Sequence, residues 1–224
     1  MKKITLDQGW EFKQITDLND CTASSFLPVT QFPTVAHMDL LGHNLIADPF
    51  IDDNEIKSLW VNEAYWIYRT LEIPNIDLSN STEKAVLVFE GLDTVVDVFL
   101  NGKHILFSKN MHISHRVDVT QLLKLADGKS TLELRFKNAP AFARKEKDRI
   151  GYKCKNPNDI HFGGPERLFL RKAQYHWVGK SSSNRTAVAN TIVGLGLGPI
   201  CQHCWSMEAN IFGNLQPKNS RSHH

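Results

Sequence analysis

The sequence predicts an all-β fold, an antiparallel β-sandwich of the jelly-roll type with one or two short helices and an irregular C-terminal tail. Three observations support this prediction. Apolar and polar residues alternate through most of residues 64–136, turn residues interrupt that alternation, and only one stretch has the composition of a longer helix. Short strands separated by turns about every 8–12 residues favour hairpins over parallel strands, which need long helical crossovers.

The predicted elements follow in chain order. A first strand is expected near residues 9–13, with long loops from there to residue 63. Further strands are expected at 64–73, 85–90, 95–100, 103–106, 116–119 and 131–137. Asn101-Gly102 joins two of these strands and is typical of a type I′ hairpin turn, which needs positive φ at both central residues. One helical turn is expected at 120–125, and a helix at Ala139–Ile150, directly after Asn138.

The composition changes between Trp177 and Val178. Residues 1–177 hold 45 of the 50 charged residues and 19 of the 21 aromatic ones, whereas the last 47 residues hold five and two. The last part also has little periodicity. We therefore expect one folded domain at 1–177, followed by a disordered tail at 178–224.

Charge and hydropathy argue against several classes of function. The net charge is +2 and basic residues are mixed with acidic ones, so we expect no nucleic-acid partner. No run of 18 apolar residues occurs, so we expect no membrane span. The N-terminal sequence MKKITLDQGWEFKQ lacks the apolar region of a signal peptide, which predicts a cytoplasmic location with Cys21 and Cys154 as free thiols.

Four patterns that could hold a metal or a cofactor lack the rest of their motif. They are the acidic run at 52–55, the histidines at 104, 112 and 115, the CxxC at 201–204 and the GxGxG at 194–198. The acidic run has no Gly and distal Glu of a calcium loop, and Pro199 prevents a helix after the glycines. We expect no metal and no cofactor.

Aromatic and basic residues near the end of the predicted domain suggest a sugar site. Tyr175 and Trp177 offer rings for the C–H faces of a sugar, and Arg171 and Lys172 offer donors to its hydroxyls. An equal alternative is that these rings fill the core of the sandwich, which we expect for Trp66 and Tyr68.

Longer segments add a family resemblance. FPTVAHMDLL (32–41), LWVNEAYWIYRT (59–70), FEGLDTVVDVFLNGKHI (89–105) and FGGPERLFLRKAQYHW (162–177) resemble the N-terminal, galactose-binding-like domain of β-mannosidases, most closely the intracellular fungal type. These enzymes are retaining glycoside hydrolases of family 2. The ending RKAQYHW is similar to β-mannosidases specifically, while FEGLDT and VFLNG are shared with β-galactosidases and β-glucuronidases.

The resemblance implies a function for the parent protein and a limit for this chain. The implied reaction is hydrolysis of terminal non-reducing β-D-mannose residues in β-mannosides. The implied pocket wall retains Arg171, Lys172, Tyr175 and Trp177. Both catalytic glutamates of the family lie on a barrel that follows this domain, so no catalytic residue is expected within these 224 residues, and the chain itself is expected to be inactive.

The resemblance stops after Trp177, where the family continues GWDWGP. Here residues 194–199 read GLGLGP. One possible codon sequence for GWDWGP is GGC TGG GAC TGG GGC CCN. When these codons are translated from their third base, they give Leu-Gly-Leu-Gly-Pro, which is the sequence of residues 195–199. A retained intron spanning residues 178–193, sixteen codons plus one base, would produce this shift of frame. We therefore interpret the break as a retained intron with a frameshift, and a divergent natural tail is the alternative.

Two other functions remain open from the sequence. One is a free-standing carbohydrate-binding module that uses residues 171–177. The other is a fragment of a family 2 glycosidase with a different sugar specificity.

Overall fold

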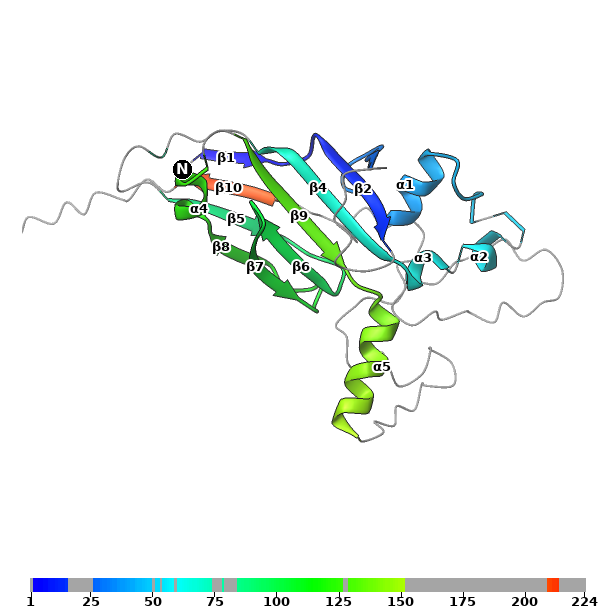
Figure 1. Cartoon of the computed structure of the whole chain (residues 1–224). Coiled ribbons are helices and arrows are strands. Elements are labelled where there is room, and N and C mark those ends of the chain that lie inside the picture. Colours follow the sequence, from blue (N-terminus) through cyan, green and yellow to red (C-terminus); the bar gives the residue numbers. More distant parts are fainter. Residues whose placement is uncertain are drawn as a thin grey trace, which may run out of the picture.

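Two antiparallel sheets form the body of the computed structural model (Figure 1), which describes residues 2–15, 26–49, 51–52, 54–58, 60–73, 78, 84–126, 129–151 and 209–213. The larger sheet has the order β3-β2-β4-β9-β6-β7. Its strands are β2 (Trp10–Ile15), β3 (Leu27–Pro28), β4 (Tyr65–Ile73), β6 (Val96–Leu100), β7 (Lys103–Ser108) and β9 (Ser130–Phe136).

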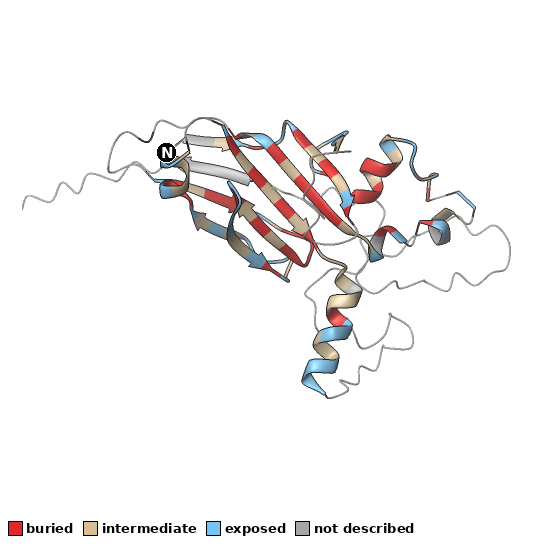
Figure 2. Ribbon diagram, viewed as in Figure 1, coloured by how far each residue is buried: buried red, intermediate tan, exposed pale blue. Residues whose placement is uncertain are grey.

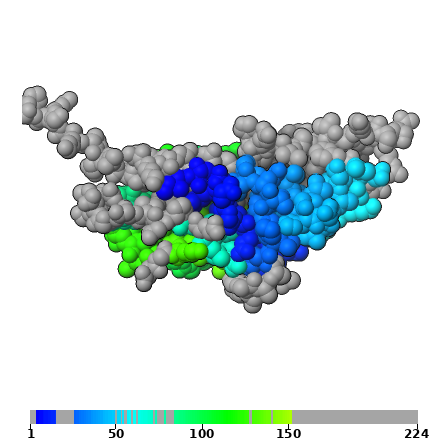
Figure 3. Space-filling view, turned by 90° about the horizontal axis from the view of Figure 1, so that it is seen from above, coloured from blue at the N-terminus to red at the C-terminus, as the bar shows by residue number. Residues whose placement is uncertain are grey.

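The smaller sheet has the order β1-β10-β5-β8. Its strands are β1 (Lys2–Thr5), β5 (Ala85–Phe89), β8 (His115–Asp118) and β10 (Ala209–Gly213). The helices are α1 (Ala36–Gly42), α2 (Asn54–Lys57), α3 (Trp60–Glu63), α4 (Thr120–Lys124) and α5 (Ala139–Ile150). Seen from above (Figure 3), the N-terminal segment in dark blue lies beside the lighter blue segment that carries α1.

The core lies between the two sheets. Buried and half-buried residues alternate along β9, so Leu132 and Leu134 face inward, and both are fully buried (Figure 2). Leu87 and Phe89 of the smaller sheet belong to the same cluster of buried residues. Complete burial of one such side chain is worth about 1.5–3 kcal/mol, so this shared cluster is what holds the sheets together. The predicted all-β sandwich is confirmed.

Two local predictions are confirmed in detail. Asn101 and Gly102 have φ values of 51° and 76° between β6 and β7, as the hairpin requires. Helix α5 begins at Ala139 and ends at Ile150, as predicted. Asn138 caps it by accepting a hydrogen bond from the backbone N–H of Ala141 at 2.8 Å, and Gly151 ends it with φ 71°.

The segment between β2 and β4 differs from the prediction of long loops, since it carries α1, α2 and α3. Helix α1 has no side-chain cap and only seven residues, and short helices of this kind are marginal by themselves. Ala36 and Leu40 of α1 are buried in the main core. Tertiary packing therefore forms α1, which a local reading of its sequence does not reveal. No helix among the described ranges has both the length and the apolar character to span a membrane.

Strand β10 also differs from the prediction, because it lies within the segment 178–224 that was expected to be a disordered tail. Its five residues pair antiparallel with β1 on one side and with β5 on the other. The structure therefore has a short strand, Ala209–Gly213, inside that segment. The rest of that segment lies outside the described residues, so the domain boundary at Trp177 stays a prediction.

Candidate functional site

The residues predicted to contact sugar, Arg171, Lys172, Tyr175 and Trp177, lie outside the described residues, so their role stays a prediction. The other aromatic prediction is confirmed. Trp66 and Tyr68 are 6% and 1% exposed and belong to the main core. The Trp66 indole N–H donates to the backbone carbonyl of Val61 at 2.9 Å, so its polar atom is satisfied inside the protein.

The described residues with the chemistry of a sugar site lie on the outer face of the six-stranded sheet. Strand alternation places the partners of the buried residues on this face, in two rows that cross the strands. We call them the charged face: Glu11, Arg69, Glu133, Phe99 and His104 in one row, and Lys13, the fully buried Ile67, Arg135, Asp97 and Phe107 in the next, with Lys137 beside them.

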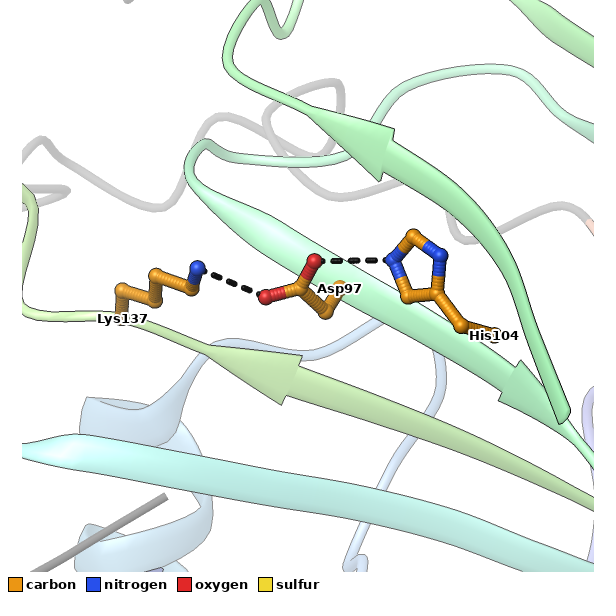
Figure 4. Close-up of polar contacts among 3 residues, drawn as sticks. All are labelled: Asp97, His104 and Lys137. Atoms are coloured by element: carbon orange, nitrogen blue, oxygen red, sulfur yellow. Dashed lines mark hydrogen bonds and ion pairs between the residues drawn. The ribbon is translucent and has the colours of Figure 1, made fainter. Parts of the chain in front are cut away.

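Asp97 of β6 is a bridging residue on the charged face (Figure 4). Its Oδ2 atom lies 2.7 Å from Nζ of Lys137, and its Oδ1 atom lies 2.9 Å from Nε2 of His104. Lys137 follows β9 and His104 belongs to β7, so one carboxylate joins the two neighbours of its own strand. Asp97 therefore contributes to strand cohesion.

The aromatic rings of the charged face are covered by cations. The guanidinium of Arg135 lies 4.3 Å from the centre of the Phe99 ring, and Nζ of Lys137 lies 5.1 Å from that of Phe107. A sugar would have to displace these cations to stack on the same ring faces, and such cation–π contacts are worth about 0.5–1 kcal/mol at exposed sites.

The arginines of the charged face are also held by carboxylates. Arg69 pairs with Glu11 across β4 and β2, and Arg135 pairs with Glu133 along β9. The charged face therefore has the residue types of a carbohydrate site, but their charges and ring faces are directed at one another. This arrangement favours a structural role.

A second polar cluster lies inside the protein, where α1 meets the larger sheet. The Tyr68 hydroxyl donates to Oδ2 of Asp39 at 2.9 Å, and the backbone N–H of Thr30 donates to Oδ1 at 3.3 Å. Asp39 has no exposed surface. Burial raises the pKa of the Asp39 carboxyl above its ordinary value of 3.8, although the hydrogen bonds from Thr34, Tyr68 and Thr30 act in the opposite direction.

Burial, together with the nearby Asp39 charge, also raises the pKa of Tyr68 well above 10. The phenol thus stays protonated and acts as a donor. The turn before α1 is held close to the helix as well, because a Cβ on Gly42 would lie 2.8 Å from the Thr30 side chain. Asp39 and Gly42 together fix the position of this turn.

Two of the three histidines considered as metal ligands have other side-chain contacts. His104 binds Asp97, and Nε2 of His115 lies 3.0 Å from the Ser108 hydroxyl. Within the part of the chain that the structure describes, no group of three or more His, Cys, Asp or Glu could hold a metal ion. The CxxC at 201–204 and the GxGxG at 194–198 fall outside that part.

Sequence reasoning missed both polar clusters. Asp39 lies in a stretch that was expected to be a loop, so nothing indicated its burial. Asp97 and His104 lie on the outward face of two strands that a predicted hairpin joins. The register of that hairpin could have predicted that the two side chains lie close together.

The two sheets and their common core define a β-sandwich domain. The family model for the glycosyl hydrolase 2 galactose-binding domain-like family matches residues 10–180, and the chain belongs to this family.

Curated relatives are similar to the same region. Beta-mannosidase B of Thermothelomyces thermophilus is 45% identical over 178 residues, which are 78% of this chain and 19% of the relative. Beta-mannosidase B of Aspergillus terreus is 41% identical over 177 residues, 77% of this chain and 20% of the relative. The chain therefore spans about a fifth of the length of these relatives.

A solved structure agrees. The β-D-mannosidase of Dictyoglomus thermophilum is 32% identical with a TM-score of 0.66, covering 78% of this chain and 20% of that one. The resemblance of this chain to the N-terminal domain of β-mannosidases is confirmed.

Proposed function

We propose that this chain is the N-terminal domain of a β-mannosidase whose substrates are β-mannosides and manno-oligosaccharides with a terminal non-reducing β-D-mannose. The observation that carries the proposal is the 45% identity over 178 residues to a Beta-mannosidase B. The similarity falls on the N-terminal fifth of proteins with that name. The domain then contributes to the substrate pocket of a larger enzyme and holds no catalytic residue.

Two of the described carboxylates, Asp97 and Asp39, are consistent with this division of labour. A retaining glycosidase needs two carboxyl groups about 5 Å apart, one as nucleophile and one as acid and base. Asp97 is held between Lys137 and His104, and Asp39 is buried against Tyr68. Both carboxylates are therefore engaged in contacts within the fold. We assign the sugar contacts to Arg171, Lys172, Tyr175 and Trp177.

A chimera tests the proposal. Residues 1–177 replace the matched N-terminal part of the Thermothelomyces relative, and the product is assayed with nitrophenyl β-D-mannoside, β-D-glucosaminide and β-D-glucuronide. We expect hydrolysis of the mannoside. Arg171→Ala in the chimera removes a charge-assisted hydrogen bond worth about 1.5–3 kcal/mol. It should thereby lower kcat/KM by roughly tenfold to a hundredfold.

A matched control replaces Arg144, an exposed residue of α5, with Ala, which should leave kcat/KM unchanged. A chimera that has the circular dichroism spectrum of the unaltered relative but hydrolyses none of the three substrates would contradict the proposal. Preference for the glucosaminide or glucuronide would assign the domain to a different specificity.

The free-standing carbohydrate-binding module is the second candidate, and titration calorimetry of the 224-residue chain with mannobiose separates it from the first. The covered rings of the charged face disfavour binding there. Saturable heat that disappears in Trp177→Ala would support such a module.

A further inference from the structure

The hairpin turn between β6 and β7 joins an asparagine to a glycine at the surface. Asn101 and Gly102 are both exposed, and both have positive φ, 51° and 76°. A Cβ atom on Gly102 would meet no atom within 4 Å, so the space beside its backbone is open. The backbone nitrogen after an asparagine can attack the side-chain amide, and a glycine at that position has no side chain to obstruct the attack. The turn therefore contains both reacting groups of a deamidation.

The amide of Asn101 is bound to the first residues of β9. The backbone N–H of Thr131 donates to Oδ1 at 2.8 Å, and Nδ2 donates to the Ser130 hydroxyl at 3.2 Å. The backbone N–H of Asn101 also donates to the carbonyl of Thr131, at 2.9 Å. Since a backbone N–H can only donate, the Thr131 contact identifies the oxygen of the amide. Both ends of the Asn101 amide therefore have a partner on β9.

The two side-chain hydrogen bonds act on the amide in different ways. The Thr131 N–H polarises the amide carbonyl and would stabilise the negative charge that develops on Oδ1 during attack, as the donors of an oxyanion hole do. The bond to Ser130 holds Nδ2, the leaving nitrogen, and must break before that nitrogen departs. At 3.2 Å this bond is at the long end of the ordinary range. The contact with Ser130 is thus the one that opposes the reaction.

We propose that Asn101 is a deamidation site of the folded chain, and that the hydrogen bond from Nδ2 to Ser130 sets its rate. The Gly102 nitrogen forms a bond to Cγ of Asn101 while the Cγ–Nδ2 bond breaks, and the Gly102 proton leaves with Nδ2 as ammonia. Water, the only co-reactant, then opens the cyclic imide. Cleavage of the new bond gives aspartate, and cleavage of the original peptide bond gives a β-linked aspartate with an added methylene in the main chain.

The two products have different effects on the hairpin. Aspartate retains the oxygen that accepts from Thr131, and the Ser130 hydroxyl can rotate to donate to the second oxygen. The β-linked product lengthens a two-residue turn whose geometry depends on positive φ at both positions. It should therefore disturb β7, an edge strand whose Phe107 ring lies 6.2 Å from the Phe142 ring of α5, centre to centre.

Peptide mapping by mass spectrometry measures the reaction in the full chain, incubated at mildly alkaline pH and well below its midpoint of unfolding. We expect conversion at Asn101 and none at Asn44, which is exposed with a φ of 56° but is followed by Leu45. Ser130→Ala should raise the rate at Asn101 by roughly twofold to tenfold, the factor that corresponds to the loss of one neutral hydrogen bond. Asn101→Gly suits the positive φ of the turn and removes the amide, so the mass change should disappear.

Asn138→Ala is the matched control, because it removes contacts of α5 and leaves the hairpin contacts in place. Its rate at Asn101 should equal that of the unaltered chain. No conversion at Asn101 in the unaltered folded chain, over a time in which a free peptide of residues 98–106 converts completely, would overturn the deamidation site. Equal rates in the Ser130→Ala and unaltered chains, or equal acceleration by Asn138→Ala and Ser130→Ala, would overturn the role of the Ser130 bond.

Discussion

Asp39 and Tyr68 show what a single polar pair does in this core. The carboxyl group is fully buried, yet it receives donors from Tyr68 and from the Thr30 backbone. Because these donors come from β4 and from the turn before α1, the pair joins the helical segment to the sheet. A sequence reading recognised the burial of Tyr68 from its alternation with other apolar residues, but alternation says nothing about Asp39.

Removal of the Tyr68 hydroxyl should reveal this pair through its pH dependence. The raised pKa means that ionisation of Asp39 lowers the free energy of unfolding as the pH rises from 3.8 through its folded-state pKa. The Tyr68 bond favours the ionised form. Tyr68→Phe should therefore cost about 1–3 kcal/mol near neutral pH and less under acidic conditions.

Urea unfolding at several pH values measures the effect. Tyr65→Phe is the matched control, since Tyr65 is a half-buried residue of the same strand. A Tyr68→Phe cost that stays constant from acidic to neutral pH would contradict the assigned role of the hydroxyl.

At the scale of elements, α5 shows how far local sequence rules extend. Asn138 and the composition of residues 139–150, with several Ala, Lys and Arg, predicted the helix from local signals, and Gly151 ends it in the structure. The contact that positions the helix is not local, because Asn138 Nδ2 donates to the backbone carbonyl of Glu63 in α3 at 2.6 Å. Local signals predict that a helix forms, and they leave open where it lies.

Two substitutions separate the helix cap from the hydrogen bond between Asn138 and the Glu63 carbonyl. Asn138→Ala loses both interactions and should cost about 0.5–2 kcal/mol from the cap alone. Asn138→Ser keeps a capping oxygen but is too short to reach Glu63, so its cost should be smaller. Hydrogen exchange of the α5 amides and urea unfolding provide the measurements, and equal costs for Ser and Ala would mean that the cap contributes nothing.

A substitution on the charged face distinguishes a contribution to stability from a contribution to substrate binding. Asp97, Lys137 and His104 are 20%, 25% and 47% exposed, and ion pairs with this much solvent contact contribute about 1 kcal/mol or less. Asp97→Asn should cause a small, salt-dependent loss of stability and leave kcat/KM of the chimera unchanged. A clear fall in kcat/KM with unchanged stability would place the charged face in the substrate site.

For the whole molecule, the sequence predicted the fold class and the family, but not the completion of the smaller sheet. The alternation in residues 64–136 predicted the strands, since each strand shows its own inward face. Strand β10 has no such signal, because its place is set by main-chain ladders with β1 and β5 that are far from it in sequence. The sugar-contacting residues at 171–177 were proposed from their chemistry and from the family resemblance. A local sequence pattern does not predict where in the fold such residues lie.

The purified 224-residue chain should not hydrolyse a chromogenic β-mannoside. It spans about a fifth of the relatives named Beta-mannosidase B, and the resemblance assigns both catalytic glutamates to a following barrel. Saturable hydrolysis by this chain, absent from a preparation of the Arg171→Ala variant made in parallel, would contradict the expectation and move the catalytic site into these 224 residues.

The position of β10 has a consequence for substitutions within it. Its backbone pairs with a neighbour on both sides, with β1 and with β5, so the strand has no free edge at which a missing N–H would be harmless. A proline at the middle of β10 would therefore cost more than a proline at the edge strand β8 of the same sheet.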